Sequence, residues 1–184
     1  MCTTTPITIN WHYDITADVL FVPTVQNSVA SVVTAIHKSG WRKPIIGADG
    51  WSDADELQSC GEACIGALFT ANFIADGDIP QSAERTKFVD KFMKKYNYKP
   101  NPTAALAYDA LNLIKTGLEK WNLSCNLIVN RNGLRDAMDS LTDFSGVSGF
   151  IPSFDENRNP TGKCVPIGKV DSNFQPILYD EYCV

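Results

Sequence analysis

The stretch that decides the fold spans residues 18–48 and reads DVLFVPTVQNSVASVVTAIHKSGWRKPIIGA. Residues 18–23 form a short apolar run that ends in turn chemistry, which is typical of a strand buried on both faces of a parallel sheet. Apolar residues recur at helical spacing over residues 29–36, and Gly40 suits the left-handed conformation after a last helical turn. A second apolar strand covers residues 44–48. A strand, a helix and a strand within about thirty residues predict a right-handed βαβ unit.

Three more helices are predicted between residues 82 and 141. The first begins at Ser82 and ends before Pro100, with its lysines on the solvent side. The second opens near Pro102, and a short third helix is capped by Asn132. The second helix has one apolar face with small residues that allow close packing against a sheet, so we expect this face to be buried. Its members are Ala104, Ala107, Tyr108, Leu111, Ile114 and Leu118.

A β-rich tail closes the sequence. Residues 149–154, 164–170 and 176–182 have the pattern of strands separated by polar turns, which predicts an antiparallel arrangement. Cys164 and Cys183 flank the last turn and would lie nearly opposite each other, so a disulfide between them would suit an exported protein. A slip of one residue in the pairing would instead point the two side chains to opposite faces. The whole chain is predicted to be α/β with a β-rich end.

Composition limits the class of protein. Of the 184 residues, 44% are hydrophobic, which is ordinary for a soluble globular protein. The net charge is -5 and the 16 lysines and arginines are scattered, so no nucleic-acid partner is expected. The apolar stretches fall far below the roughly 20 residues that span a bilayer, and the first residues lack the regions of a signal peptide. Cys2 resembles the lipid-bearing cysteine of a mature lipoprotein, although a cysteine beside an expression start is an equal alternative.

The residues available for catalysis are few. His12 and His37 are the only imidazoles, and the sequence has no zinc-protease motif, nucleophile elbow, phosphate loop or dinucleotide fingerprint. We therefore expect no enzyme, no metal site and no cofactor. Cys60 and Cys64 lie four residues apart, and we interpret them as small buried residues that fill space in a packed helix. The alternative is a small α/β thiol or hydrolytic enzyme that uses one of them as its nucleophile.

Asp49 is the main candidate for ligand binding. It follows the second strand directly, within the run GADGW at residues 47–51. In parallel α/β sheets, ligands bind outside the carboxyl ends of the strands. A carboxylate at this place would hold an ammonium group while the Trp51 indole covers an apolar side chain. The alternative is a turn aspartate that accepts backbone hydrogen bonds before a glycine.

Six segments, in order along the chain, resemble a known family. They are similar to the C-terminal half of the Leu/Ile/Val-binding family of ABC-transporter extracytoplasmic solute-binding proteins, over about residues 18–177. Each segment is a weak match by itself, but chance matches would not keep their order and spacing. The segments are residues 17–23 (ADVLFVP), 46–51 (IGADGW), 104–110 (AALAYDA), 134–137 (LRDA), 144–149 (FSGVSG) and 154–157 (FDEN).

The resemblance implies a type I periplasmic binding fold, in which two α/β lobes close on a ligand. Such lobes have parallel-sheet βαβ units with helices on both faces. Residues 18–75 would belong to the second lobe and residues 76–146 to the first, and the β-rich tail at 147–184 would return to the second lobe. Residues 1–17 match nothing in the family. The first half of the family's sequence has no counterpart here, so this two-lobed fold is expected to be incomplete.

The resemblance also implies a ligand site. Asp49 matches the acidic position that holds the α-amino group of an amino acid, branched-chain or similar. Thr103 falls near a contact on the first lobe, across the cleft. Trp51 and Gln26 would lie close to Asp49. Val25 stands where some relatives have a ligand-facing aromatic residue, and this departure leaves the choice of amino acid open.

A protein of this kind would be the receptor component of an ABC transporter. Its partners would be a small amino-acid-like ligand and the membrane permease. Its location would be extracytoplasmic, in the periplasm or lipid-anchored at the cell surface. An alternative is a ligand-free interaction fragment. Incomplete sheets would leave strand edges open, so we also expect a homodimer or higher oligomer that exchanges residues 1–17 or the tail.

Overall fold

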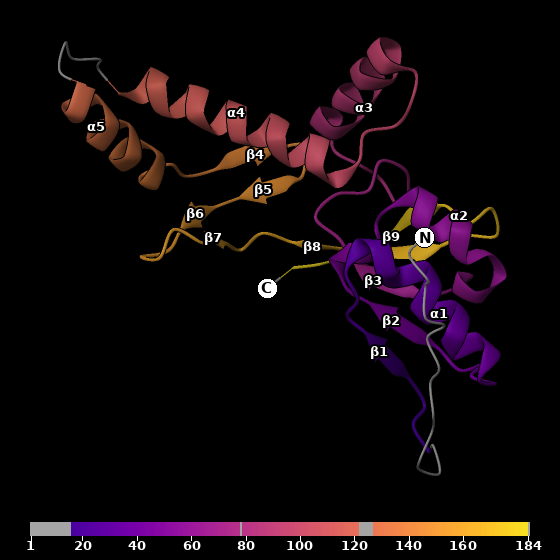
Figure 1. Ribbon diagram of the computed structural model, residues 1–184. Coiled ribbons are helices and arrows are strands. Elements are labelled where there is room, and N and C mark those ends of the chain that lie inside the picture. The colour runs from indigo at the N-terminus through magenta and orange to yellow at the C-terminus, as the bar shows by residue number, and fades with distance from the viewer. Residues whose placement is uncertain (1–15, 78, 122–126, 184) are drawn as a thin grey trace, which may run out of the picture. The chain divides into compact units, whose positions relative to one another are not determined.

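The computed structural model describes residues 16–77, 79–121 and 127–183, and the chain divides into two compact units (Figure 1). Unit 1 contains the residues up to Ile79 together with Pro166–Asp180. Unit 2 contains Pro80–Val165 and the residues from Glu181 onward. The β-rich tail is therefore divided between the two units. Cys2 and His12 lie outside the described part of the chain, as do all but the last two of residues 1–17, so the predicted exchange of that segment stays a prediction.

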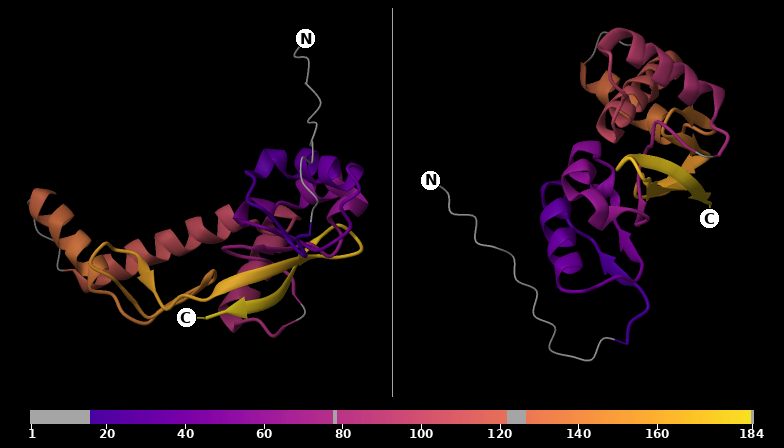
Figure 2. Two further views of the ribbon diagram at one scale, coloured as in Figure 1. Left: turned by 90° about the horizontal axis from the view of Figure 1, so that it is seen from below. Right: turned by 90° about the vertical axis from the view of Figure 1, so that its right-hand side faces the viewer.

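The sheet of unit 1 confirms the predicted βαβ unit. Its strands lie in the order β1-β2-β3-β8-β9. The first three strands are parallel, with Phe21 opposite Ile46 and Gly47 opposite Phe69, and β8 runs antiparallel to β3. β8 and β9 lie side by side in both views of Figure 2. The strands are β1 (Leu20–Val22), β2 (Ile45–Gly47), β3 (Leu68–Thr70), β8 (Val165–Val170) and β9 (Pro176–Tyr182).

Two α-helices and three short 3-10 helices accompany these strands in unit 1. α1 (Val29–Lys38) ends just before Gly40, whose φ of +97° confirms the predicted left-handed position. α2 (Ala54–Cys60) packs against α1, as expected for helices that follow neighbouring parallel strands. The 3-10 helices are η1 (Gln26–Ser28), η2 (Asp49–Trp51) and η3 (Gly61–Cys64).

The core of unit 1 combines apolar side chains from the sheet and from these helices. β1 departs from the prediction that it is buried on both faces, because Phe21 is 62% exposed. This strand is the edge of the sheet, and only Val22 within it is fully buried. The completely buried members of the core are Val29, Val33, Trp51, Leu57, Cys64, Val170 and Leu178.

Unit 2 contains three helices and two ribbons of two strands each among its described residues. Ser82 Oγ accepts a hydrogen bond from Arg85 N (3.2 Å), so the first of these helices begins where the sequence predicts. Asn101 Oδ1 caps the second helix by accepting from Ala104 N (2.9 Å), with Pro102 in the first turn. The elements are α3 (Ala83–Tyr96), α4 (Pro102–Lys120), α5 (Leu127–Asp139), β4 (Phe144–Gly146), β5 (Gly149–Ile151), β6 (Ser153–Phe154) and β7 (Pro160–Thr161).

The start of α5 differs from the prediction. The helix begins at Leu127, so Asn132 lies inside it and does not cap it. The reason is packing against α4: a Cβ atom at Gly117 would lie only 2.7 Å from Met138 Cγ, which places the two helices in close contact. Such tertiary contact outweighs the weak helix preference of single polar residues.

The apolar face of α4 is exposed, which contradicts the prediction that it is buried. Leu111 is 68% exposed, and Ile114 and Leu118 are exposed as well. In Figure 1, α3 packs near the start of α4 and α5 packs along its end, and neither covers these side chains. Unit 2 has no sheet wider than two strands among its described residues, so α4 lacks the layer against which such a face ordinarily packs.

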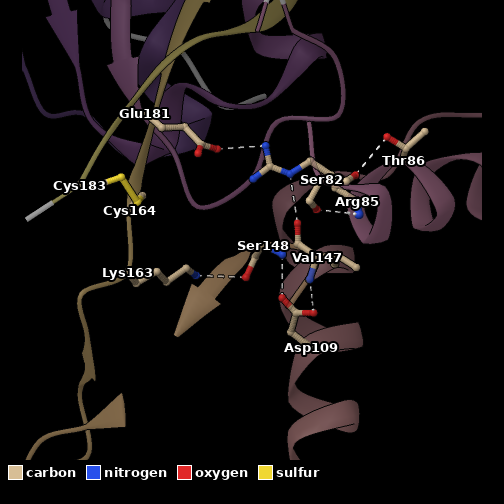
Figure 3. A network of polar contacts seen from close by, with 10 residues as sticks. All are labelled: Ser82, Arg85, Thr86, Asp109, Val147, Ser148, Lys163, Cys164, Glu181 and Cys183. Carbon is tan, nitrogen blue, oxygen red and sulfur yellow. Dashed lines mark hydrogen bonds and ion pairs between the residues drawn. A yellow bond between two sulfur atoms is a disulfide. The ribbon is translucent and has the colours of Figure 1, made fainter. Parts of the chain in front are cut away.

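A buried polar network joins four parts of unit 2 (Figure 3). Asp109 of α4 accepts hydrogen bonds from Val147 N (2.7 Å) and Ser148 N (2.8 Å), which lie in the turn between β4 and β5. Arg85 of α3 donates from Nε to Val147 O (3.2 Å) and pairs with Glu181 at 3.2 Å. Because Asp109 and Arg85 are themselves buried, these bonds satisfy charges that would otherwise be costly.

Lys163 extends this network. Its Nζ donates to Ser148 Oγ at 3.1 Å. Burial lowers the pKa of the Lys163 ammonium from its ordinary value, since loss of water penalises the charged form. The negative charge of Asp109 opposes this effect, and the positive charge of Arg85 adds to it.

Two disulfides are present. Cys164–Cys183 joins the two tail strands, so of the two outcomes that the sequence left open the bond is the one found. Cys60–Cys64 contradicts the interpretation of these cysteines as free buried thiols in one helix. The physical reason is that α2 ends at Cys60. The next residue, Gly61, has a φ of +60° and turns the chain so that the two sulfurs meet.

Candidate functional site

The loops that follow β1 and β2 lie together in unit 1. We call residues 23–28 and 48–53 the platform. Since β1 and β2 are parallel neighbours, their carboxyl ends meet at the same edge of the sheet. Four of the predicted site residues, Val25, Gln26, Asp49 and Trp51, come from these two loops.

Asp49 is the exposed carboxylate of the platform. It is the first residue of η2 and follows β2 after one residue. Its backbone oxygen accepts hydrogen bonds from Ser52 Oγ (2.8 Å) and Ser52 N (3.4 Å), which fix the turn. Its carboxylate makes no hydrogen bond or ion pair with the residues that the structure describes. Asp49 is thus held in place through its backbone while both carboxylate oxygens stay open to a ligand.

The buried side chain of Trp51 holds this turn in place. The indole is completely buried and its Nε1 donates to Val22 O at 3.0 Å. A Cβ atom at Gly47 would lie 2.4 Å from the indole ring, so only glycine leaves room for it. The expectation that Trp51 covers the apolar part of a ligand does not fit this burial. Trp51 instead ties the loop after β2 to the end of β1.

Further contacts hold the two loops together. A Cβ atom at Gly50 would lie 2.6 Å from Thr24 O, so glycine permits the backbone of one loop to touch the other. Gln26 Nε2 donates to Asp53 Oδ2 at 2.6 Å. Val25 is 73% exposed at the start of η1. The platform is therefore a braced surface with a single open carboxylate and an apolar side chain beside it in sequence.

Asp53 and Glu56, which follow Asp49 in the chain, both make structural hydrogen bonds to backbone N–H groups. Asp53 Oδ1 accepts from Asp55 N (3.0 Å) and Glu56 N (3.1 Å) and caps α2. Glu56 Oε2 accepts from Ala30 N (3.2 Å) at the start of α1. The spacing of Asp53 and Glu56 matches a capping box, a signal that would have predicted α2. The alternative role for Asp49, a turn residue that accepts backbone hydrogen bonds, belongs to Asp53.

Thr103, the remaining predicted site residue, belongs to unit 2. It lies exposed in the first turn of α4. Its predicted contact with a ligand stays a prediction.

The chemistry of the platform suits binding of a cation. Asp49 places an unpaired negative charge at this edge of unit 1, and a carboxylate accepts hydrogen bonds from an ammonium group. The thiol-enzyme alternative loses its nucleophile in this form of the protein, because Cys60 and Cys64 are joined in a disulfide.

Comparison with known proteins identifies the family. A family model described as periplasmic binding protein matches residues 15–175, and no curated protein sequence matches the chain. None of the described helices is both long and apolar enough to cross a membrane.

Several solved structures have a similar fold. LivK, a leucine-binding protein from Thermotoga maritima, has 23% identity and a TM-score of 0.74. LivJ, a branched-chain amino acid transporter substrate binding protein from Streptococcus pneumoniae solved with isoleucine, has 27% identity and a TM-score of 0.73. An ABC-transporter solute binding protein from R. palustris, solved with benzoate, has 18% identity and a TM-score of 0.71.

These alignments cover 90%, 91% and 91% of the present chain, respectively, and 44% of each of the other chains. The chain thus spans less than half the length of these relatives. With the family model matched over residues 15–175 and the strand order described above, the chain belongs to the periplasmic binding protein family and carries part of the type I periplasmic binding fold.

Proposed function

We propose that this chain is the ligand-gripping part of an ABC-transporter receptor that captures an amino acid, branched-chain or similar. Membership of the periplasmic binding protein family supports the receptor role. The S. pneumoniae relative was solved with isoleucine, and another relative from Desulfitobacterium hafniense was solved with leucine. A receptor of this kind acts outside the cytoplasm, delivers its ligand to a membrane permease and performs no catalysis.

One observation supports this function most directly: the Asp49 carboxylate is exposed, has no partner among the described residues, and sits on a braced turn after β2. The ammonium group of an amino acid would donate hydrogen bonds to both carboxylate oxygens. A hydrogen bond to a charged group contributes about 1.5–3 kcal/mol. Because Trp51 and Gly50 already fix the turn, little conformational freedom would be lost on binding.

The same carboxylate bears on ligand class. The R. palustris relative was solved with benzoate, which has a carboxylate and no ammonium group. At the present platform, Asp49 would repel an anion that lacks an ammonium group. A zwitterionic amino acid is therefore favoured over a simple carboxylate, and the exposed Val25 would offer an apolar contact to its side chain.

Substitution of Asp49 tests this function. Asp49→Asn keeps the size of the side chain and removes its charge, so we expect the fold to persist and the affinity for leucine or isoleucine to fall about ten- to hundredfold. Isothermal titration calorimetry measures the affinity, after a thermal-shift screen over the amino acids has identified the best ligand. A ligand that binds only the folded state must raise the apparent stability in that screen.

Asp55→Asn is the matched control, because Asp55 is an exposed carboxylate in the first turn of α2 with no proposed ligand contact. Its affinity should stay within about twofold of the unchanged protein, apart from a small electrostatic effect. Equal affinities for the Asp49→Asn variant and the unchanged protein would remove Asp49 from the site. Binding of benzoate in preference to leucine would contradict the proposed ligand class.

A further inference from the structure

The two disulfides of the chain differ in how far solvent reaches them. Cys60 is 6% exposed and Cys64 is completely buried, so their bond lies inside unit 1. Cys183 is exposed and Cys164 is half-buried. Cys164 also lines a cavity of about 210 Å³ in unit 2. A thiol reagent in solution can therefore reach Cys164–Cys183 in the folded protein, whereas Cys60–Cys64 is shielded from it.

An ion pair of unit 2 lies next to the exposed disulfide (Figure 3). Glu181 precedes Cys183 by two residues, and its carboxylate accepts a hydrogen bond from Arg85 Nη1 at 3.2 Å. The side chain of Arg85 is only 6% exposed, and that of Glu181 is 33% exposed. Both charged residues also line the cavity beside Cys164. The disulfide and the ion pair thus hold the same segment, residues 181–183, against the rest of unit 2.

We propose that Cys164–Cys183 is a thiol–disulfide exchange site, and that its reduction weakens the Arg85–Glu181 ion pair. The reductant is a dithiol, and one of its thiolates attacks the exposed sulfur of Cys183. The S–S bond breaks, and Cys164 leaves as a thiolate that takes up a proton. The second thiol of the reductant then attacks the mixed disulfide, releases Cys183 and closes a disulfide within the reductant. Altogether the reductant loses two electrons and two protons, and the two cysteines gain them.

Reduction affects the ion pair through the freedom of the chain. Cys164 and Cys183 are 19 residues apart, and opening their bond restores conformational freedom to residues 181–183. More entropy is then lost when Glu181 is held in place. Arg85 is buried, and a buried guanidinium that loses a carboxylate partner is less stable. Reduction should therefore loosen the contact between this segment and α3.

The same coupling acts in the opposite direction. If the disulfide favours the ion pair, the ion pair favours the disulfide by the same free energy. Removing the charge of Glu181 should therefore make the bond easier to reduce. A disulfide that acts as an independent brace would be insensitive to this change. Sensitivity to Glu181 thus separates a coupled exchange site from a brace.

Selective reduction of the full chain tests whether the site exchanges. Free thiols are blocked with iodoacetamide, the folded protein is treated with limiting dithiothreitol near neutral pH, and the released thiols are trapped with N-ethylmaleimide. Peptide mass spectrometry should find the second label on Cys164 and Cys183, while Cys60 and Cys64 stay joined. Reduction in denaturant is the control and should label all four, because unfolding exposes the buried bond. An unchanged circular dichroism spectrum verifies that the selectively reduced chain is still folded.

Glu181→Gln tests the coupling, because it removes the charge and keeps the size of the side chain. At a fixed ratio of reduced to oxidised dithiothreitol, we expect the ratio of open to closed Cys164–Cys183 to rise about fivefold, the lower end of the range for coupled sites. Glu156→Gln is the matched control, since Glu156 is an exposed carboxylate in the turn between β6 and β7 of the same unit. Its ratio should stay within about twofold of the unchanged chain.

Three outcomes overturn the proposal. Reduction of Cys60–Cys64 before or together with Cys164–Cys183 contradicts the exchange site, as does a Cys164–Cys183 bond that stays closed until the protein unfolds. Equal ratios for Glu181→Gln and Glu156→Gln contradict the coupling to the ion pair. None of these results bears on the Asp49 site, which belongs to unit 1.

Discussion

Asp49 and Trp51 are two positions apart and have opposite surroundings. The carboxylate faces water without a partner among the described residues, while the indole is completely buried and bonded to Val22 O. The position of Asp49 after a buried strand is visible in the sequence, because parallel strands place their carboxyl ends at one edge. The burial of Trp51 is not visible there, because it depends on Gly47 leaving space beneath the ring.

The role of Trp51 leads to a prediction about stability. Trp51→Phe keeps an aromatic ring but loses the hydrogen bond to Val22 O, so the free energy of unfolding should fall by about 2 kcal/mol. Urea unfolding at fixed protein concentration measures this change. The ligand affinity should fall as well, because the turn that presents Asp49 loses its support.

Trp121→Phe is the comparison variant. The Trp121 Nε1 has no hydrogen-bond partner among the described residues, so Trp121→Phe should lower the free energy of unfolding by less than Trp51→Phe does. If both variants lose the same stability, the hydrogen bond to Val22 O does not account for the role of Trp51.

Among the elements, α4 shows where sequence patterns succeed and where they fail. Its start at Pro102, its length and its apolar face follow from capping and helical periodicity. Periodicity also predicts that the face is buried, and this is wrong. The pattern shows which side of the helix is apolar, but it does not show whether another element packs against that side. Asp109 lies within the same helix, and its role in the turn between β4 and β5 depends on contacts 38 and 39 residues away.

A substitution at Asp109 tests the importance of this buried network. Asp109→Asn retains one acceptor oxygen and turns an amide nitrogen toward the second backbone N–H group, so one donor is left without an acceptor. We expect the free energy of unfolding to fall by about 2–3 kcal/mol. Urea unfolding measures it, with Asp136→Asn as control, because Asp136 is exposed and its substitution should change stability by less than about 0.5 kcal/mol. An Asp109→Asn variant as stable as the control would mean that the network is not a stabilising contact.

For the molecule as a whole, the order of segments predicted the fold better than it predicted the contacts. The βαβ unit and the tail strands follow from local patterns, whereas pairing across one turn left the Cys164–Cys183 bond open, because a slip of one residue would have prevented it. The Cys60–Cys64 bond was not predicted, because it requires a helix to end between two cysteines four residues apart. The exposed Phe21 of β1 was not predicted either, since edge strands and central strands share the same apolar composition.

The two disulfides should stabilise the chain to different degrees. In the chain-entropy account, a bond closing the longer loop constrains the unfolded chain more: about 3 kcal/mol for Cys164–Cys183 and about 2 kcal/mol for Cys60–Cys64, whose partners are 19 and 4 residues apart. Replacing each pair by alanine and measuring urea unfolding gives both values. Peptide mass spectrometry without reductant verifies the bonds, and free thiols at all four positions would show that neither disulfide forms.

The path of the chain through unit 1 has a consequence for its synthesis. β3 pairs with β8, so Leu68 meets Lys169 only after about a hundred further residues have left the ribosome. Until then β3 has one bare edge, and the core lacks Val170 and Leu178, both of which are completely buried in the finished protein. Residues 80–165 of unit 2 are continuous in sequence, although the Arg85–Glu181 pair and the Cys164–Cys183 bond still require the end of the tail. During synthesis the first strands of unit 1 therefore stay incompletely paired until β8 and β9 are available.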